Sequence, residues 1–94
     1  MTKQQQAQKL YEAIVKIQNV EECQAFFEDL CTIREIQDIS QRFEVASMLM
    51  EGRNYQTVSN VTGASTATIC RVSKCLNYGT GGYKTVLERM GGEK

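Results

Sequence analysis

The sequence predicts an all-α fold, and three observations support this. The 94 residues contain no proline, and residues that favour helices dominate. Apolar residues recur at helical spacing in several segments that end at glycine or asparagine. The stretch YQTVSNVTGASTATICRVSK, residues 55–74, has the pattern of two short helices joined at a glycine. A chain of this length forms one domain, which we expect to span residues 1–94.

Residues 55–76 form the candidate helix-turn-helix. Gly63 can adopt a positive φ at the point where the first helix must stop. Ser65 can cap the second helix by accepting a hydrogen bond from a backbone N–H two or three residues later. The expected inward positions are small or apolar, and they are Val58, Ala64, Ile69 and Val72.

The outer face of the second helix begins with short side chains and carries no acid. Short side chains let a helix approach base edges, and a methyl group can contact the methyl of thymine. Arg71 and Lys74 follow one turn later, where they can reach phosphates or a guanine. Gln56, in the first motif helix, is placed to reach a base or a phosphate. The face predicted to read DNA comprises Ser65, Thr66, Ala67, Cys70, Arg71 and Lys74. The alternative is an ordinary Thr-rich surface helix.

Charge is divided unevenly along the chain, although the formal net charge is zero. Residues 1–51 carry five Lys or Arg and nine Asp or Glu, a net charge of −4. Residues 52–94 carry six basic and two acidic side chains, a net charge of +4, with no acid before Glu88. A basic stretch that coincides with the motif favours a polyanionic partner such as double-stranded DNA.

Two helices are predicted before residue 31. Residues 4–18 carry an apolar stripe of period 3.6, and Asn19 is a plausible stop for this helix. Residues 20–30 open with Glu21 and Glu22, which are favourable near a helix N-terminus. The two apolar faces consist of Ala7, Leu10, Tyr11, Ile14 and Ile17, and of Cys23, Phe26, Phe27 and Leu30.

The longest helix is predicted at residues 33–51. Thr32 and Glu35 fit a capping box at its start. Gly52 is expected to end it in the left-handed conformation, and Asn54 to cap the next helix. Apolar side chains surround much of this helix, so we expect it to be the central element of the core. They are Ile36, Ile39, Phe43, Ala46 and Met50, widened by Ile33, Met48 and Leu49.

Residues 77–82 contain three glycines in four positions and predict a connector. A short last helix follows, and its apolar residues are Tyr83, Val86, Leu87 and Met90. A helix of about two turns is too short to be stable alone. We therefore expect it to dock on its own core or on a second subunit.

The residues that most enzymes and metal sites need are missing. There is no histidine, no CxxC pair among the four cysteines, and no Walker or GxGxxG pattern. We therefore expect no enzyme and no metal site. No run of about eighteen apolar residues and no signal-peptide pattern occurs, so we expect a cytoplasmic protein without disulfides. Cys23 and Cys75 are expected in apolar packing, and Cys70 on the outer face.

Several segments resemble the tryptophan repressor superfamily, most closely its YerC/YecD-type branch. The resemblance covers about residues 20–78, and the segments occur in order with near-matching spacing. It implies a six-helix fold and an intertwined homodimer whose N-terminal helices interlock. It also implies transcriptional regulation, as a repressor, through two helix-turn-helix heads. The matching segments are Leu30-Cys31-Thr32, Ile39-Ser40-Gln41-Arg42, Met50-Glu51-Gly52 and Thr62-Gly63-Ala64-Ser65-Thr66-Ala67-Thr68-Ile69-Cys70-Arg71.

The resemblance also implies a place for a small-molecule corepressor, between the long central helix and the recognition helix. Val72 stands where the tryptophan repressor has glycine, and Cys75 where it has serine. Val72 should fill space that an indole would occupy, which argues against tryptophan. An ion pair or cap contact within the chain is an alternative role for Arg42. The matching ligand-binding positions are Thr32, Arg42, Thr68 and Arg71.

Three functions therefore remain open. The first is a homodimeric DNA-binding regulator that reads a roughly palindromic site. The second is a helix-turn-helix used as a protein-interaction module. The third is a repressor gated by a corepressor other than tryptophan, bound between Arg42 and Arg71.

Overall fold

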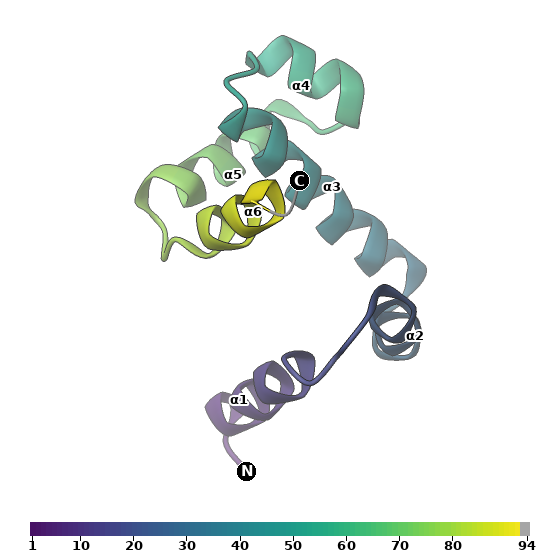
Figure 1. Cartoon of the computed structure of the whole chain (residues 1–94). Coiled ribbons are helices and arrows are strands. Elements are labelled where there is room, and N and C mark those ends of the chain that lie inside the picture. The colour runs from purple at the N-terminus through teal and green to yellow at the C-terminus, as the bar shows by residue number, and fades with distance from the viewer. Residues whose placement is uncertain (93–94) are drawn as a thin grey trace. The chain divides into compact units, whose positions relative to one another are not determined.

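The computed structural model describes residues 1–92, and within this range the regular structure is entirely helical (Figure 1). This confirms the predicted all-α fold and its six helices; the last two residues of the expected domain, 1–94, lie outside the described part. The chain divides into two compact units, Met1–Ile36 and a second that begins at Gln37. The helices are α1 (Lys3–Ile14), α2 (Val20–Leu30), α3 (Ile33–Met50), α4 (Tyr55–Thr62), α5 (Thr66–Tyr78) and α6 (Gly82–Gly92).

The boundary between α1 and α2 differs from the prediction. α1 ends at Ile14 rather than at Gln18, because two N–H groups in the following segment bond to carbonyls only three residues back, at 3.0 and 3.1 Å. Asn19 does not stop α1 but caps α2. Its side-chain oxygen accepts the backbone N–H of Glu22 at 2.8 Å.

Both ends of α3 are fixed by the residues expected there. The Glu35 N–H donates to Thr32 Oγ1 at 3.1 Å, and the Thr32 N–H donates to Glu35 Oε1 at 2.8 Å, which confirms the capping box. At the other end, Gly52 has φ 85°. Its N–H and that of the next residue bond to carbonyls of the last turn at 3.0 and 3.1 Å. These two bonds form a Schellman motif, which satisfies carbonyls that the helix leaves unpaired.

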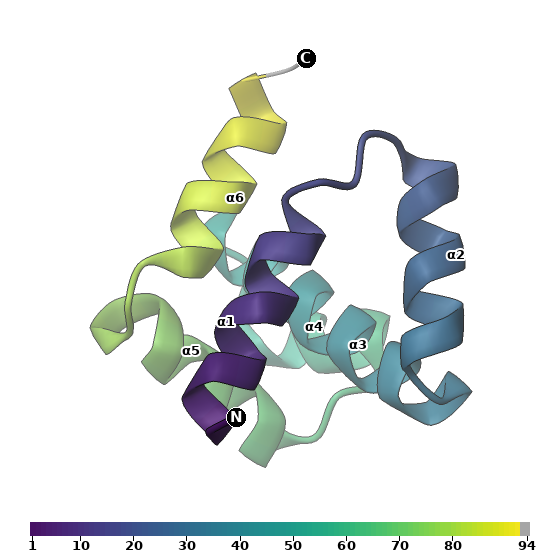
Figure 2. The same ribbon diagram turned by 90° about the horizontal axis from the view of Figure 1, so that it is seen from below.

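The core of the second unit lies where α4, α5 and the C-terminal half of α3 meet (Figures 1 and 2). The four predicted inward positions of the motif are all buried. α6 packs on this core through Tyr83 and Leu87, and Figure 2 shows how the connector after α5 leads into it. The buried side chains are Val45, Ala46, Met48, Val58, Ala64, Ile69, Val72 and Leu76.

The central role expected for α3 holds only for its second half, and the predicted stripe is only partly right. Ile39 and Met50 are 37% and 40% exposed, whereas Val45, outside the predicted stripe, is fully buried. A helix with apolar residues on several sides does not reveal by spacing alone which side its neighbours will cover.

The first unit contrasts with the second, because none of its residues is buried. Large apolar side chains are open to solvent there, with Val15, Val20 and Ile33 each more than three-quarters exposed. Phe26 and Phe27 are half-buried and make an edge-to-face contact, with ring centroids 5.7 Å apart. Within residues 1–92 no helix has the length and apolar character needed to cross a bilayer.

Candidate nucleic-acid interface and adjoining pocket

The turn between α4 and α5 is closed by a set of short hydrogen bonds. Gly63 has φ 74°, and its N–H donates to the Ser59 carbonyl at 2.9 Å. Ser59 Oγ in turn donates to the Ala64 carbonyl at 3.0 Å. Thr62 Oγ1 donates to the Val58 carbonyl at 2.7 Å and accepts the Ala64 N–H at 3.1 Å. These bonds fix the direction in which α5 leaves the turn.

Gln41 of α3 supports the same turn, and the sequence analysis did not single it out. Its Nε2 donates to the Thr62 carbonyl at 3.1 Å, in a partly buried position. A Cβ at Gly63 would lie 3.9 Å from the same nitrogen, so the amide packs directly against the turn. The available signal was its place beside Arg42 in the segment that carries the family resemblance.

The start of α5 is capped as predicted. Ser65 Oγ accepts the Thr68 backbone N–H at 3.2 Å and donates to Thr68 Oγ1 at 3.1 Å. Thr66 and Ala67, the next two residues, are exposed and have no role in the core. The cap therefore occupies the two hydroxyls of Ser65 and Thr68, and leaves the side chains of Thr66 and Ala67 facing solvent.

The structure exposes every side chain predicted for the outer face. Gln56 is also exposed, on α4, where its Nε2 donates to Asn60 Oδ1 at 3.1 Å. No acidic side chain occurs between Gly52 and Leu87 to oppose a polyanion. The exposed set is Ser65, Thr66, Ala67, Cys70, Arg71 and Lys74.

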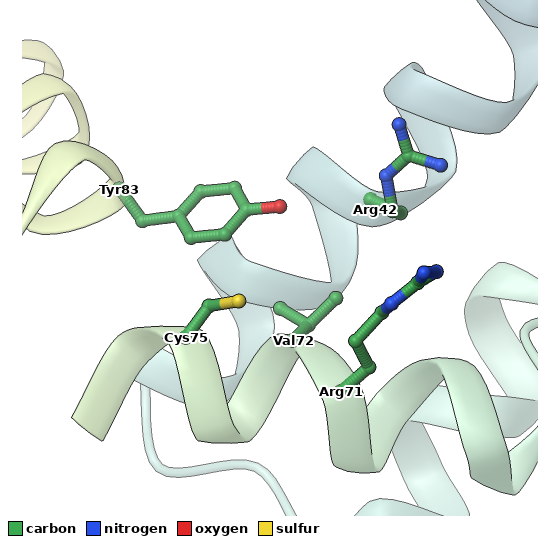
Figure 3. Close-up of a pocket in the computed structure, with 5 residues that line it drawn as sticks. All are labelled: Arg42, Arg71, Val72, Cys75 and Tyr83. Atoms are coloured by element: carbon green, nitrogen blue, oxygen red, sulfur yellow. The ribbon is translucent and has the colours of Figure 1, made fainter. Parts of the chain in front are cut away.

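A pocket of about 310 Å³ lies between α3, α5 and α6 (Figure 3). It brings together two of the four predicted ligand-binding residues, Arg42 and Arg71. Thr68 is engaged with Ser65 and does not line the pocket. Thr32 belongs to the first unit, where it caps α3. The lining residues are Arg42, Arg71, Val72, Cys75 and Tyr83.

Both arginines of the pocket lack an acidic partner in the part of the chain that the structure describes. Neither side chain makes an ion pair or a hydrogen bond with residues 1–92. The ion pair or cap contact considered for Arg42 is therefore not observed there. Arg42 is half-buried and Arg71 is exposed, so two positive charges border the pocket.

Cys75 and Tyr83 differ from the sequence-based expectation. Cys75 was expected in apolar packing, but it is exposed and lines the pocket, because it lies beside rather than on the inward side of α5. Tyr83 was interpreted only as part of an apolar stripe. In Figure 3 its ring lies above Cys75 on the side of α5 that also carries Val72, and its centroid is 6.5 Å from that of Phe43.

The described residues contain no cluster of three His, Cys, Asp or Glu side chains that could hold a metal ion. The polar groups that line the pocket are two guanidinium groups, a thiol and a phenol.

Comparison with known proteins identifies the family. A family model described as Trp repressor protein matches residues 5–91. The chain belongs to the Trp repressor family. It is 52% identical over 82 residues to YerC, an uncharacterized protein of Bacillus subtilis (strain 168), covering 87% of this chain and 79% of YerC. The resemblance stated from the sequence is thereby confirmed.

Two solved structures are similar to this chain over most of its length. A putative Trp repressor from Staphylococcus aureus has a TM-score of 0.87 at 47% identity, covering 90% of this chain and 85% of that one. A TrpR-like protein from Eubacterium eligens ATCC 27750 has a TM-score of 0.89 at 53% identity, covering 95% and 92%. These matches support the TrpR-like character of the six-helix arrangement.

Replacing Gln41 with alanine should loosen the turn. The variant removes the donor to the Thr62 carbonyl, and we expect a loss of about 1 kcal/mol in the free energy of unfolding. Urea denaturation at a fixed protein concentration measures this change. Gln37→Ala, an exposed position on the same helix, is the matched control and should change stability little. Equal effects of the two substitutions would contradict the assigned role of Gln41.

Proposed function

We propose that this protein is a homodimeric, sequence-specific DNA-binding transcription regulator that acts as a repressor. The observation that carries the proposal is the exposed, acid-free start of α5, held in place by the hydrogen-bonded turn at Gly63. Membership of the Trp repressor family supports the same conclusion. Two such helices, one from each subunit, would enter successive major grooves about 34 Å apart.

The side chains of this face divide by the chemistry that they can offer to DNA. The small side chains and the thiol at the start of α5 would face base edges, and Gln56 of α4 would reach a base or a phosphate. Lys74 would bind a phosphate, as would Arg71 when no ligand engages it. The proposed base-facing residues are Ser65, Thr66, Ala67 and Cys70.

The dimer is proposed because the first unit carries apolar side chains that the chain itself does not bury. Helix α1 carries Leu10 and Ile14 along one stripe and Ile17 follows the helix, yet no residue of the unit is buried within the chain. Fully burying an exposed side chain of this size contributes about 1.5–3 kcal/mol. These three are half-buried, so a second copy of the same unit would add part of that stabilisation for each. Membership of the Trp repressor family supports a dimer, and the resemblance stated from the sequence implies that its N-terminal helices interlock.

The pocket favours a second candidate, in which a ligand gates DNA binding. Two unpaired guanidinium groups and a phenol border one cavity between α3, α5 and α6. Val72 and Tyr83 restrict that cavity, which supports a corepressor other than tryptophan. Thr32 and Thr68 remain proposed ligand contacts only because the family resemblance implies them.

Lys74→Ala should weaken DNA binding uniformly across sequences. Removing one phosphate contact should also reduce the slope of log affinity against log salt by about one. Gel-shift titrations with a random duplex pool at several salt concentrations measure both effects. Lys9→Ala, an exposed lysine of α1, is the control and should leave the slope unchanged. If no duplex binds at any salt concentration, the motif serves another partner, as in a protein-interaction module.

Thr66→Ala should instead relax sequence preference. Losing a contact to one base edge should reduce discrimination by about 1–3 kcal/mol at one position of the site, with little change in the salt slope. Selection of bound duplexes from a random pool, followed by sequencing, gives the preference for each variant. Asn77→Ala, near the end of the same helix, is the control. An unchanged selected sequence for Thr66→Ala would remove Thr66 from the reading face, the set of exposed residues of α5 predicted to contact DNA (Ser65, Thr66, Ala67, Cys70, Arg71 and Lys74).

Ile14→Lys should shift the protein from dimer to monomer, because a charge would enter the apolar stripe that the second copy is proposed to cover. Sedimentation velocity over a range of protein concentrations measures the mass. Gln8→Lys adds the same charge at an exposed position of the same helix and should leave the dimer intact. A wild-type protein that sediments as a monomer would overturn this part of the proposal.

A further inference from the structure

We propose that Tyr83 determines which ligands the pocket beside Arg42 and Arg71 admits. The ring of Tyr83 closes the apolar part of the pocket to an aromatic ligand, and the arginine end is left for a compact oxyanion with more than one negative charge. This inference names the class of ligand for the ligand-gated form of the proposed function. Only the effect of the ligand on DNA binding rests on that function.

The apolar part of the pocket is already covered by the chain itself. Val72 is 1% exposed and forms the floor together with Cys75. In Figure 3 the Tyr83 ring lies above Cys75, and its hydroxyl end reaches toward the side of Val72. A ligand ring would need the same surface, so it would have to displace the tyrosine.

The tyrosine ring is held from more than one side. It is half-buried and packs against the core of the second unit. On α3, Phe43 lies with its ring centroid 6.5 Å away and its plane tilted by 37°. Aromatic pairs of this kind contribute about 0.5–1.5 kcal/mol beyond the area that they bury. Displacing the ring would sacrifice these contacts, which disfavours an aromatic ligand.

The other end of the pocket is positive and polar. Arg71 extends from α5 toward α3, where Arg42 lies, and the Tyr83 hydroxyl points to this side of the pocket (Figure 3). Neither guanidinium is paired with an acid in residues 1–92. Two guanidinium groups bind oxygens of phosphate-like anions through directed, charge-assisted hydrogen bonds. A compact dianion would balance both charges without entering the space beneath the ring.

Such an anion would join α3 to α5, because Arg42 belongs to α3 and Arg71 belongs to α5. It would hold Arg71 toward the pocket and would restrict the motion of α5 relative to α3. Under the proposed function, this link would favour the arrangement of α5 that reads DNA.

The first test measures binding to the full-length protein by isothermal titration calorimetry, with inorganic phosphate and indole-3-propionate as probes. Wild type should bind phosphate, in chloride of equal ionic strength, and should show no heat with indole-3-propionate. Tyr83→Ala should bind indole-3-propionate. Tyr78→Ala removes a tyrosine that is 85% exposed at the end of α5, and it should behave as wild type.

The second test assigns the anion to the two arginines. Arg42→Gln and Arg71→Gln should each weaken phosphate binding by about tenfold, the size expected for losing a hydrogen bond to a charged group. Arg53→Gln is the matched control, because Arg53 is exposed and pairs with Glu51 at 3.3 Å. Phosphate binding that is absent in wild type, or that survives both pocket substitutions, would overturn the oxyanion assignment.

Binding of indole-3-propionate to wild type as tightly as to Tyr83→Ala would overturn the role of the ring. If Tyr83→Ala does not fold, Tyr83→Leu replaces it, since leucine keeps an apolar side chain on the core while removing the aromatic ring. These calorimetric measurements contain no DNA, and the gel-shift titrations above measure duplex binding separately. A protein that binds phosphate but no duplex would contradict the proposed function alone. A protein that binds duplex but no phosphate would contradict this inference alone.

Discussion

The turn at residues 62–65 is the constraint on which the reading face depends. One helix must end and another begin within four residues, which requires a positive φ at Gly63. An L side chain there would cost about 1–2 kcal/mol. The direction of α5 is then set by the side chains that form hydrogen bonds with backbone groups of the turn. These side chains are Ser59, Thr62 and Gln41. Because Gln41 belongs to α3, the longest helix helps to position the reading face and also contributes to the core.

The two units face different energetic problems. Within residues 37–91 the second unit buries eight apolar side chains, which form a core beside the turn and the pocket. The first unit buries none, and it contains most of the acidic residues of the chain. Charge is divided along a similar line. Basic residues gather on the unit with the proposed reading face, whereas the acidic half supplies the apolar stripe for which we propose a second copy as partner. Association and DNA binding would then use separate surfaces.

Features that depend on residues a few positions apart could be predicted from the sequence. The caps at Ser65 and Asn54, the capping box at Thr32 and the left-handed end at Gly52 all lie within one turn of their partners. The inward positions of the motif followed from helical spacing. The bond from Gln41 to the turn joins residues 21 positions apart, and no local pattern reports it. The same limit applies to which side of α3 its neighbours cover. Asn19 is different, because its bond to Glu22 joins residues three positions apart, yet the sequence analysis interpreted it as the end of the preceding helix.

Arg71 shows why the reading face and the pocket must be considered together. It belongs to the exposed face of α5, yet its side chain extends toward α3 and lines the pocket (Figure 3). One guanidinium cannot hold a DNA phosphate and a pocket anion with its full set of hydrogen bonds at the same time. Lys74 lies three residues further along α5, does not line the pocket, and is exposed to solvent. The phosphate contact would therefore rest with Lys74 whenever the pocket is filled. The base-facing residues at the start of the helix would remain unchanged, because their exposure depends on the turn and not on the ligand.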